Sequence, residues 1–186
     1  MEAVSPKLAF WECLYTPGHD AACLTRQGAD GWLLHGTTVF RHPAGPARLD
    51  YAVEIDAAWQ SRRGVIRGYL AGHRVEHLIE RHHDGWYLDG RPQGLSTLVD
   101  LDFGFTPATN LQQLRRAALQ PGQAIGMAVA WFDLQAAGLT ALPQHYECLD
   151  ATRYHYTSPD TPYEAVLELA PNGFARMYPS LWRMVE

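Results

Sequence analysis

Hydrophobic and polar residues alternate with a period of two along much of the chain. The clearest run extends from Tyr51 to Trp59, where apolar residues lie between Glu54 and Asp56. Similar alternation occurs over residues 32–40, 95–103 and 163–169. Because successive side chains of a strand point to opposite faces, the pattern predicts antiparallel strands with one covered face. The chain is therefore expected to be mainly β.

Turn-forming dipeptides separate these alternating runs at short intervals. They are Pro17-Gly18, Asp30-Gly31, Asp84-Gly85, Pro121-Gly122 and Asn172-Gly173. The pattern DGWxLxG occurs twice, over residues 30–36 and 84–90. Asp-Gly before an alternating run is a hairpin signal, so one type of turn used twice is the simplest interpretation, with a duplicated half-domain as the alternative. No low-complexity linker divides the sequence, and we expect one domain over residues 1–186.

Two segments have a helical or ambiguous pattern. Residues 111–119 are predicted to form a short helix with Leu111, Leu114, Ala118 and Leu119 on one face. Asn110 is the expected N-cap, and Pro121-Gly122 ends the helix. Residues 69–83 fit either a second short helix or a strand.

The ambiguous segment contains the sharpest motif of the chain. Residues 73–77 read His-Arg-Val-Glu-His, which fits the H-x-x-E-H pattern of zinc proteases. That chemistry requires both histidines on one helix face, with the glutamate near the metal-bound water. In a strand, Glu76 would point away from His73 and His77. A zinc-dependent hydrolase is therefore the alternative function, and it depends on a helix at this position.

A second candidate group lies over residues 100–110. Asp100 and Asp102 form a D-x-D pair, and Thr106 and Asn110 follow it with hydroxyl and amide groups. Neither a glycine-rich phosphate loop nor alternating strands and helices accompany them, as a nucleotide site would require. Turn formation and helix capping are the simpler explanations, and a polar ligand group is the functional one.

Composition and charge narrow the function further. With 47% hydrophobic and 19% charged residues, the chain has ample material for a core, which excludes intrinsic disorder. A net charge of −5 argues against a nucleic-acid-binding protein. No segment is apolar enough to cross a bilayer, and the N-terminal sequence does not read as a signal peptide, so we expect a cytoplasmic protein. Cys13, Cys23 and Cys148 form no metal-binding or disulfide pattern.

Neither a G-x-S-x-G elbow nor a Cys/His nucleophile signature is present, and we expect a protein without cofactors that is not an enzyme. Six Trp, nine Tyr and six Phe are enough to line an apolar cavity as well as a core. Arginine pairs at 62–63 and 115–116 are candidates to bind an anionic head group.

Five segments in this order carry a resemblance to a known family. They are residues 51–63, 85–90 (GWYLDG), 100–110 (DLDFGFTPATN), 114–116 (LRR) and 178–183 (YPSLWR). The chain resembles the putative glycolipid-binding family, formerly a domain of unknown function. The resemblance implies a fold similar to bacterial lipoprotein carriers: a strongly curved antiparallel sheet, as a half-barrel or flattened barrel, enclosing an apolar cavity under one or two short helices. It also implies a strand over residues 75–81.

The resulting expectation is a non-catalytic binder of a small amphiphile, either a glycolipid or a fatty-acid-like molecule. Candidates for its apolar tail are Trp59 and Trp182, and candidates for an anionic head are Arg63 and Arg116. Candidates for sugar hydroxyls are Asp100, Asp102, Thr106 and Asn110. A structural or partner-binding module is a further alternative, and the sequence assigns no oligomeric state.

Overall fold

The structure is a computed structural model that describes residues 5–28 and 31–185. Within these ranges, fifteen strands form one sheet, accompanied by one helix. The first strands are β1 (Lys7–Cys13), β2 (Gly18–Gln27), β3 (Gly31–His42), β4 (Gly45–Asp56), β5 (Ser61–Leu70), β6 (His73–His82), β7 (Gly85–Leu88) and β8 (Arg91–Gly94). The remaining elements are β9 (Leu101–Phe103), α1 (Asn110–Ala117), β10 (Ala124–Phe132), β11 (Thr140–Cys148), β12 (Arg153–Ser158), β13 (Tyr163–Leu169), β14 (Ala175–Tyr178) and β15 (Trp182–Met184).

The sheet consists of two meanders joined at their ends. Strands β1 to β8 pair in sequence order, and strands β10 to β15 do the same. The first and last strands join the two halves, because β1 and β15 pair antiparallel with Cys13 opposite Trp182. The exception to antiparallel pairing is β9, which runs parallel to β10 at one edge. The expected mainly β, antiparallel architecture is confirmed.

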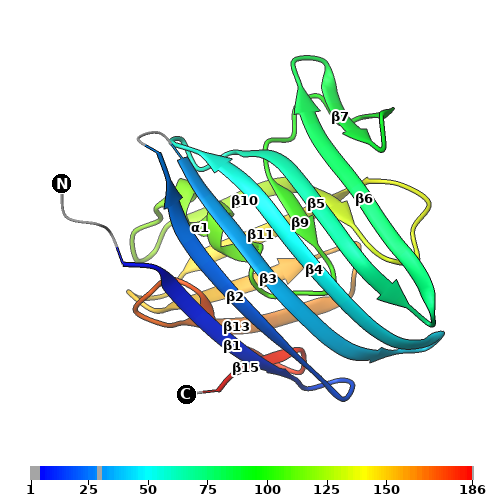
Figure 1. Cartoon of the computed structure of the whole chain (residues 1–186). Helices are drawn as coiled ribbons and strands as arrows, with labels where there is room; N and C mark the ends of the chain where they lie inside the picture. Colours follow the sequence, from blue (N-terminus) through cyan, green and yellow to red (C-terminus); the bar gives the residue numbers. More distant parts are fainter. Residues whose placement is uncertain (1–4, 29–30, 186) are drawn as a thin grey trace.

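The sheet is strongly curved and open. The long strands β2 to β6 form one layer, and β10 to β13 lie behind them (Figure 1). Within the described part of the chain, β8 and β9 are the two ends of the strand order and do not pair with each other. The half-barrel shape is confirmed. No helix formed by the described residues is long and apolar enough to span a membrane.

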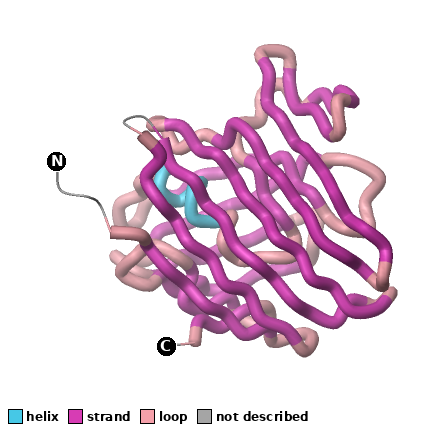
Figure 2. The backbone as a smooth tube through the Cα atoms, viewed as in Figure 1, coloured by secondary structure: helices cyan, strands magenta, loops and turns pink. Residues whose placement is uncertain are grey.

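Residues 98–117, called here the inner segment, occupy the space between the two layers. Figure 2 shows its helix behind the front strands. Toward the front layer, the amide of Gln112 donates to Ser61 Oγ at 3.0 Å. Toward the back layer, the Asn110 side chain donates to the hydroxyl of Tyr146 at 3.2 Å. The inner segment therefore links both halves of the curved sheet.

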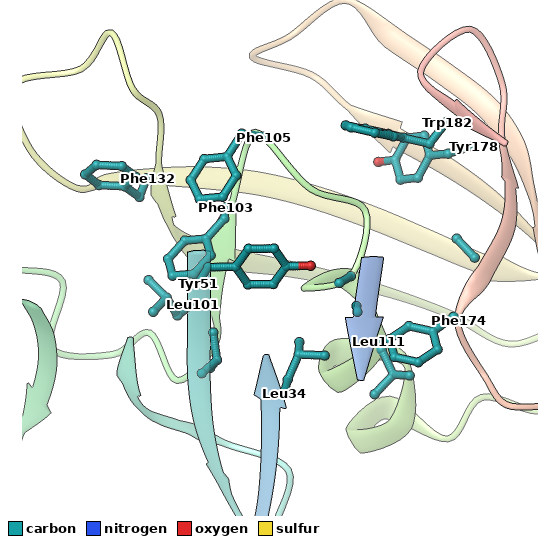
Figure 3. Close-up of a cluster of buried hydrophobic side chains, with 14 of the residues drawn as sticks. Leu34, Tyr51, Leu101, Phe103, Phe105, Leu111, Phe132, Phe174, Tyr178 and Trp182 are labelled. Carbon is teal, nitrogen blue, oxygen red and sulfur yellow. The ribbon is translucent and has the colours of Figure 1, made fainter. Parts of the chain in front are cut away.

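The hydrophobic core lies around this segment. Tyr51, Phe103 and Trp182 come from the front layer, the inner segment and the last strand, and they face the same interior (Figure 3). A close approach occurs at Gly64 of β5, where an added Cβ would lie 2.4 Å from Leu101. Burying this apolar surface is the main favourable term in stabilising the fold.

Two of the alternating runs are shorter than the sequence predicts. Strand β4 ends at Asp56, because Asp56 Oδ1 accepts the backbone N–H of Ala58 and Gln60 and so forms a turn. Trp59 adopts a left-handed backbone with φ of 60° in this turn. Over residues 95–103 the expected strand is also wrong for its first part, since Leu95 is left-handed with φ of 57°. Only Leu101–Phe103 pairs as a strand there.

The predicted helix is confirmed, but its ends and its buried face differ from those predicted for residues 111–119. Its N-cap is Thr109 rather than Asn110, and Thr109 makes no side-chain cap because its hydroxyl donates to Asp102. Leu111 and Leu114 are buried as expected, but Gln112 is buried as well. Ala118 is the left-handed C-cap and is exposed, so it does not join the apolar face.

The histidine-rich segment is the strand β6. Glu76 lies on the opposite face from His77 and forms an ion pair with Arg67 at 3.4 Å. The helical arrangement required by the zinc hydrolase alternative is therefore absent from this segment. Among residues 5–28 and 31–185, no group of three or more His, Cys, Asp or Glu side chains converges to hold a metal ion.

Both copies of the DGWxLxG pattern run into strands, as expected. Asp30 lies outside the described residues, and the strand after it is β3, which pairs antiparallel with β2. The second copy begins β7, paired with β6. The two tryptophans differ in environment, since Trp86 is fully buried whereas Trp32 is half-buried.

Candidate functional site

A cavity of about 240 Å³, called here the inner chamber, lies between the inner segment and the strands of the second half. Its polar and small residues come mostly from the inner segment, whereas strands β10 to β15 and their loops supply large apolar side chains. The lining residues are Asp102, Phe103, Gly104, Thr106, Pro107, Asn110, Trp131, Leu142, Tyr156, Thr161, Tyr163, Tyr178, Leu181 and Trp182.

Six aromatic residues line the chamber. The rings of Tyr163 and Tyr178 lie 5.4 Å apart, and those of Tyr156 and Tyr178 lie 5.7 Å apart. Burial raises the pKa of Tyr178 well above its usual value, so its hydroxyl stays neutral. Neutral phenols combine a large apolar surface with a single polar tip. The wall therefore suits a mostly apolar ligand.

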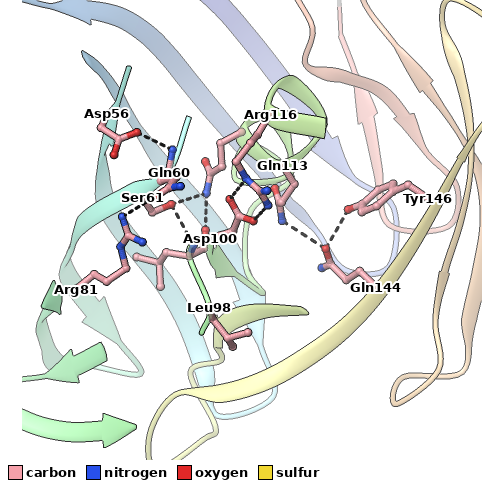
Figure 4. A network of polar contacts seen from close by, with 12 residues as sticks. Asp56, Gln60, Ser61, Arg81, Leu98, Asp100, Gln113, Arg116, Gln144 and Tyr146 are labelled. Atoms are coloured by element: carbon pink, nitrogen blue, oxygen red, sulfur yellow. Dashed lines mark hydrogen bonds and ion pairs between the residues drawn. The ribbon is translucent and has the colours of Figure 1, made fainter. Parts of the chain in front are cut away.

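One side of the chamber carries a buried polar group centred on Asp102. Its carboxylate accepts hydrogen bonds from Thr109 Oγ1 at 2.6 Å and from the Gln144 amide at 3.0 Å. Burial raises the pKa of Asp102, while these two donors act in the opposite direction. The hydroxyl of Tyr146 donates to Gln144 Oε1 (Figure 4). It also accepts from the Asn110 side chain, which connects the network to the helix α1.

A second buried network connects the chamber to the front layer through Thr106. The Thr106 hydroxyl donates to the Tyr51 hydroxyl at 3.0 Å, and Tyr51 donates to Asp20 Oδ1 at 2.7 Å. Asp20 is fully buried, and its other carboxylate oxygen has no hydrogen-bond partner among the described residues. Burial raises the pKa of Asp20 to about 7, against the opposing effect of the hydrogen bond from Tyr51.

A larger cavity of about 520 Å³, called here the outer pocket, adjoins the chamber. Gly104 lines both cavities. Tyr15 lines the outer pocket and contacts the chamber residue Trp182 edge to face, with ring centroids 6.2 Å apart. The remaining lining residues are Thr16, Phe40, Arg41, His42, Pro43, Phe105, Asp133, Leu134 and Gln135.

The structure brings together four of the eight site residues predicted from the sequence. Asp102, Thr106, Asn110 and Trp182 all line the inner chamber. Asp100 does not join them, although it lies two residues from Asp102. It precedes β9, is fully buried, and forms an ion pair with Arg116 (Figure 4).

The other predicted residues lie away from the chamber lining. Arg116 is held by Asp100, and Arg63 forms an ion pair with Glu54 at 3.1 Å on a half-exposed part of the sheet. Trp59 stacks on Trp32 with ring centroids 5.0 Å apart. The two arginines are therefore already paired with carboxylates of the protein.

Several residues of the chamber and its networks were not anticipated. Tyr156, Tyr163 and Tyr178 lie on three different strands, and each reads as an ordinary core residue of its own strand. Asp20 and Gln144 alternate in phase with buried apolar residues of β2 and β11. This position in the alternating pattern was the one sequence signal that these polar side chains are buried, because every second residue of a strand points to the same face.

Comparisons with known proteins agree with this architecture. A crystal structure of a DUF1089 family protein from Pseudomonas aeruginosa is similar in fold, with a TM-score of 0.77 and 24% sequence identity. The similarity covers 90% of this chain and 92% of that one. The curated proteins compared with the sequence include no match. The profile of the family described as "Putative glycolipid-binding" matches residues 8–184, so the chain belongs to that family.

Proposed function

We propose that the protein is a non-catalytic binder of a glycolipid or similar amphiphile, and that the apolar part of the ligand occupies the inner chamber. The observation that carries the proposal is the chamber itself, a space with aromatic walls and a buried polar group on one side. Small-molecule sites are typically concave and mostly apolar, with a few polar groups that fix orientation. Membership of the "Putative glycolipid-binding" family supports the same ligand class.

The chamber can supply substantial binding free energy to an alkyl chain. Each methylene group removed from water contributes roughly 0.8 kcal/mol, so about six buried methylenes contribute about 5 kcal/mol before the costs of association. Trp182 is nearly fully buried at 4% exposure and lies where the chamber meets the outer pocket. We expect this ring to contact the apolar part of the ligand.

Polar atoms of the ligand are expected next to Asp102, Thr106 and Asn110. All three side chains line the chamber and are held by partners behind them, so their positions are fixed before a ligand arrives. The carboxylate can accept from sugar hydroxyls, and hydroxyl and amide groups can also donate to a sugar oxygen or to a linking carbonyl. These three side chains therefore orient the ligand, while the aromatic wall supplies most of the binding free energy.

A fluorescent fatty acid tests the proposal directly. cis-Parinaric acid emits strongly in apolar surroundings, and we expect it to bind wild-type protein with a saturable increase in emission. Trp182→Ala should weaken binding about tenfold or more, because about 2 kcal/mol of apolar contact is removed. Trp59→Ala is the matched control, since Trp59 stacks on Trp32 outside the chamber. Its binding should be unchanged.

A second variant guards against misfolding of Trp182→Ala. Thr161 lines the chamber and is partly exposed, so Thr161→Trp should place a ring in the chamber with little effect on the core. We expect it to reduce binding while circular dichroism stays that of the wild type. Unchanged binding by both chamber variants would refute the proposal, as would failure of the wild type to bind either cis-parinaric acid or an uncharged alkyl amphiphile.

A further inference from the structure

The outer pocket has the composition of a polar-ligand site with aromatic walls. Tyr15 and Phe40 supply aromatic rings, while His42, Arg41 and Asp133 supply polar groups. Its volume of about 520 Å³ falls within the roughly 300–1,000 Å³ of small-molecule sites. Since it meets the inner chamber at Gly104, a ligand in one cavity can extend toward the other.

His42 presents a hydrogen-bond donor that has no acceptor. The backbone N–H of Ala44 donates to His42 Nδ1 at 3.1 Å, so Nδ1 is the acceptor nitrogen of the ring and Nε2 carries the proton. Nε2 is inaccessible to solvent and has no hydrogen-bond partner within residues 5–28 and 31–185. An unsatisfied buried donor is unfavourable. The His42 side chain lines the outer pocket, and a rotation of its ring that brings Nε2 to the pocket surface would let a ligand oxygen accept from it and relieve that cost.

The charges of the pocket favour a ligand without net charge. Arg41 and Asp133 both line it and carry opposite charges, while His42 is neutral in the tautomer that accepts from Ala44. Asp133 is fixed in place because its Oδ1 accepts the backbone N–H of Gln135 at 2.8 Å. An anionic group would be repelled by this carboxylate, whereas a hydroxyl can donate to it.

The aromatic residues add a second feature that suits a sugar. Tyr15 and Phe40 line the pocket with ring surface, and the C–H face of a pyranose packs against such rings while its hydroxyls reach polar groups at the edge. Tyr15 also contacts Trp182, which lines the chamber. The pocket therefore combines aromatic surface, one free donor and one carboxylate acceptor beside the apolar chamber.

We propose that the outer pocket binds a neutral sugar head group, with His42 Nε2 donating to a sugar oxygen and Asp133 accepting from a hydroxyl. This inference rests on the proposed function, because the apolar part of the same ligand occupies the inner chamber. It assigns the head group to residues other than Arg63 and Arg116, both of which are engaged in ion pairs.

Three ligands with the same alkyl chain test this assignment by isothermal titration calorimetry. The probes are decyl glucoside, decanol and decanoate, each used below the concentration at which it forms micelles. Wild-type protein should bind decyl glucoside more tightly than decanol or decanoate. In His42→Phe, affinity for decyl glucoside should fall about threefold to tenfold, the range expected for one neutral hydrogen bond, while affinity for decanol stays unchanged.

Two further variants separate a lost hydrogen bond from a disturbed fold. His42→Gln keeps an amide donor and should restore part of the preference for decyl glucoside. His35→Phe is the matched control, because His35 is exposed on the other face of β3. It should leave all three affinities unchanged.

The outcomes distinguish this inference from the proposed function. If decanol and decyl glucoside bind equally, or if His42→Phe leaves their ratio unchanged, the sugar assignment is wrong while amphiphile binding stands. Tighter binding of decanoate would overturn the neutral head group. If none of the three ligands binds wild-type protein, the proposed function fails and the inference fails with it.

Discussion

Replacement of the buried carboxyl group of Asp20 should change how stability depends on pH. Burial raises its pKa from 3.8 to about 7, so the folded protein keeps Asp20 protonated at pH values where the unfolded chain has lost the proton. Stability from this group is therefore fully present below about pH 4 and declines as pH rises to about 7. A shift of about three units corresponds to about 4 kcal/mol.

Urea unfolding at several pH values measures this effect. Asp20→Asn replaces the titrating group with a neutral one of the same shape, so its stability relative to wild type should rise by up to about 4 kcal/mol between pH 4 and pH 8. Asp160→Asn is the control, because Asp160 is exposed and its replacement should leave the free energy of unfolding nearly unchanged. A difference between Asp20→Asn and wild type that is constant from pH 4 to pH 8 would refute the reasoning. Carbon-13 NMR titration of the Asp20 carboxyl in the wild type gives an independent value.

Three other perturbations follow from contacts in the interior. Gly64→Val should lower the free energy of unfolding by about 1–3 kcal/mol, because its Cβ would overlap Leu101. Gly126 faces open space, so Gly126→Val should not have this effect. Equal effects of the two variants on urea unfolding would contradict this expectation. Arg116→Leu leaves the fully buried Asp100 without its ion-pair partner and should cost about 3 kcal/mol; a loss under 1 kcal/mol would show that the pair is dispensable. Treatment with EDTA should leave the melting temperature unchanged, and a decrease would indicate a metal ion bound at the histidine-rich strand β6.

The strands were predictable because their signal is local. The run that begins at Tyr51 directs alternate residues into the core, and its period shows directly in the sequence. The end of the same strand could not be predicted from its alternation. Asp56 closes a turn with its side chain, and the left-handed conformation of Trp59 cannot be read from an alternation that continues through it.

The candidate site was harder to predict because its residues converge from distant strands. Tyr156 and Tyr178 come from different strands and contact each other in the chamber wall, yet each reads as an ordinary core position in its own strand. Arg116 reads as a surface cation, and the short helix α1 is what carries it to Asp100. Three of the four predicted residues that line the chamber, Asp102, Thr106 and Asn110, belong to one short segment of the chain. The fourth, Trp182, was predicted on its aromatic ring alone.

The central claim is that the inner chamber holds the apolar part of an amphiphile. Native mass spectrometry of protein purified from its own host, followed by denaturing extraction, tests it most directly. The account predicts a bound amphiphile in the wild type that is lost in Trp182→Ala and retained in Trp59→Ala. A bare protein mass in the wild type, or a bound amphiphile that persists equally in Trp182→Ala, would contradict it.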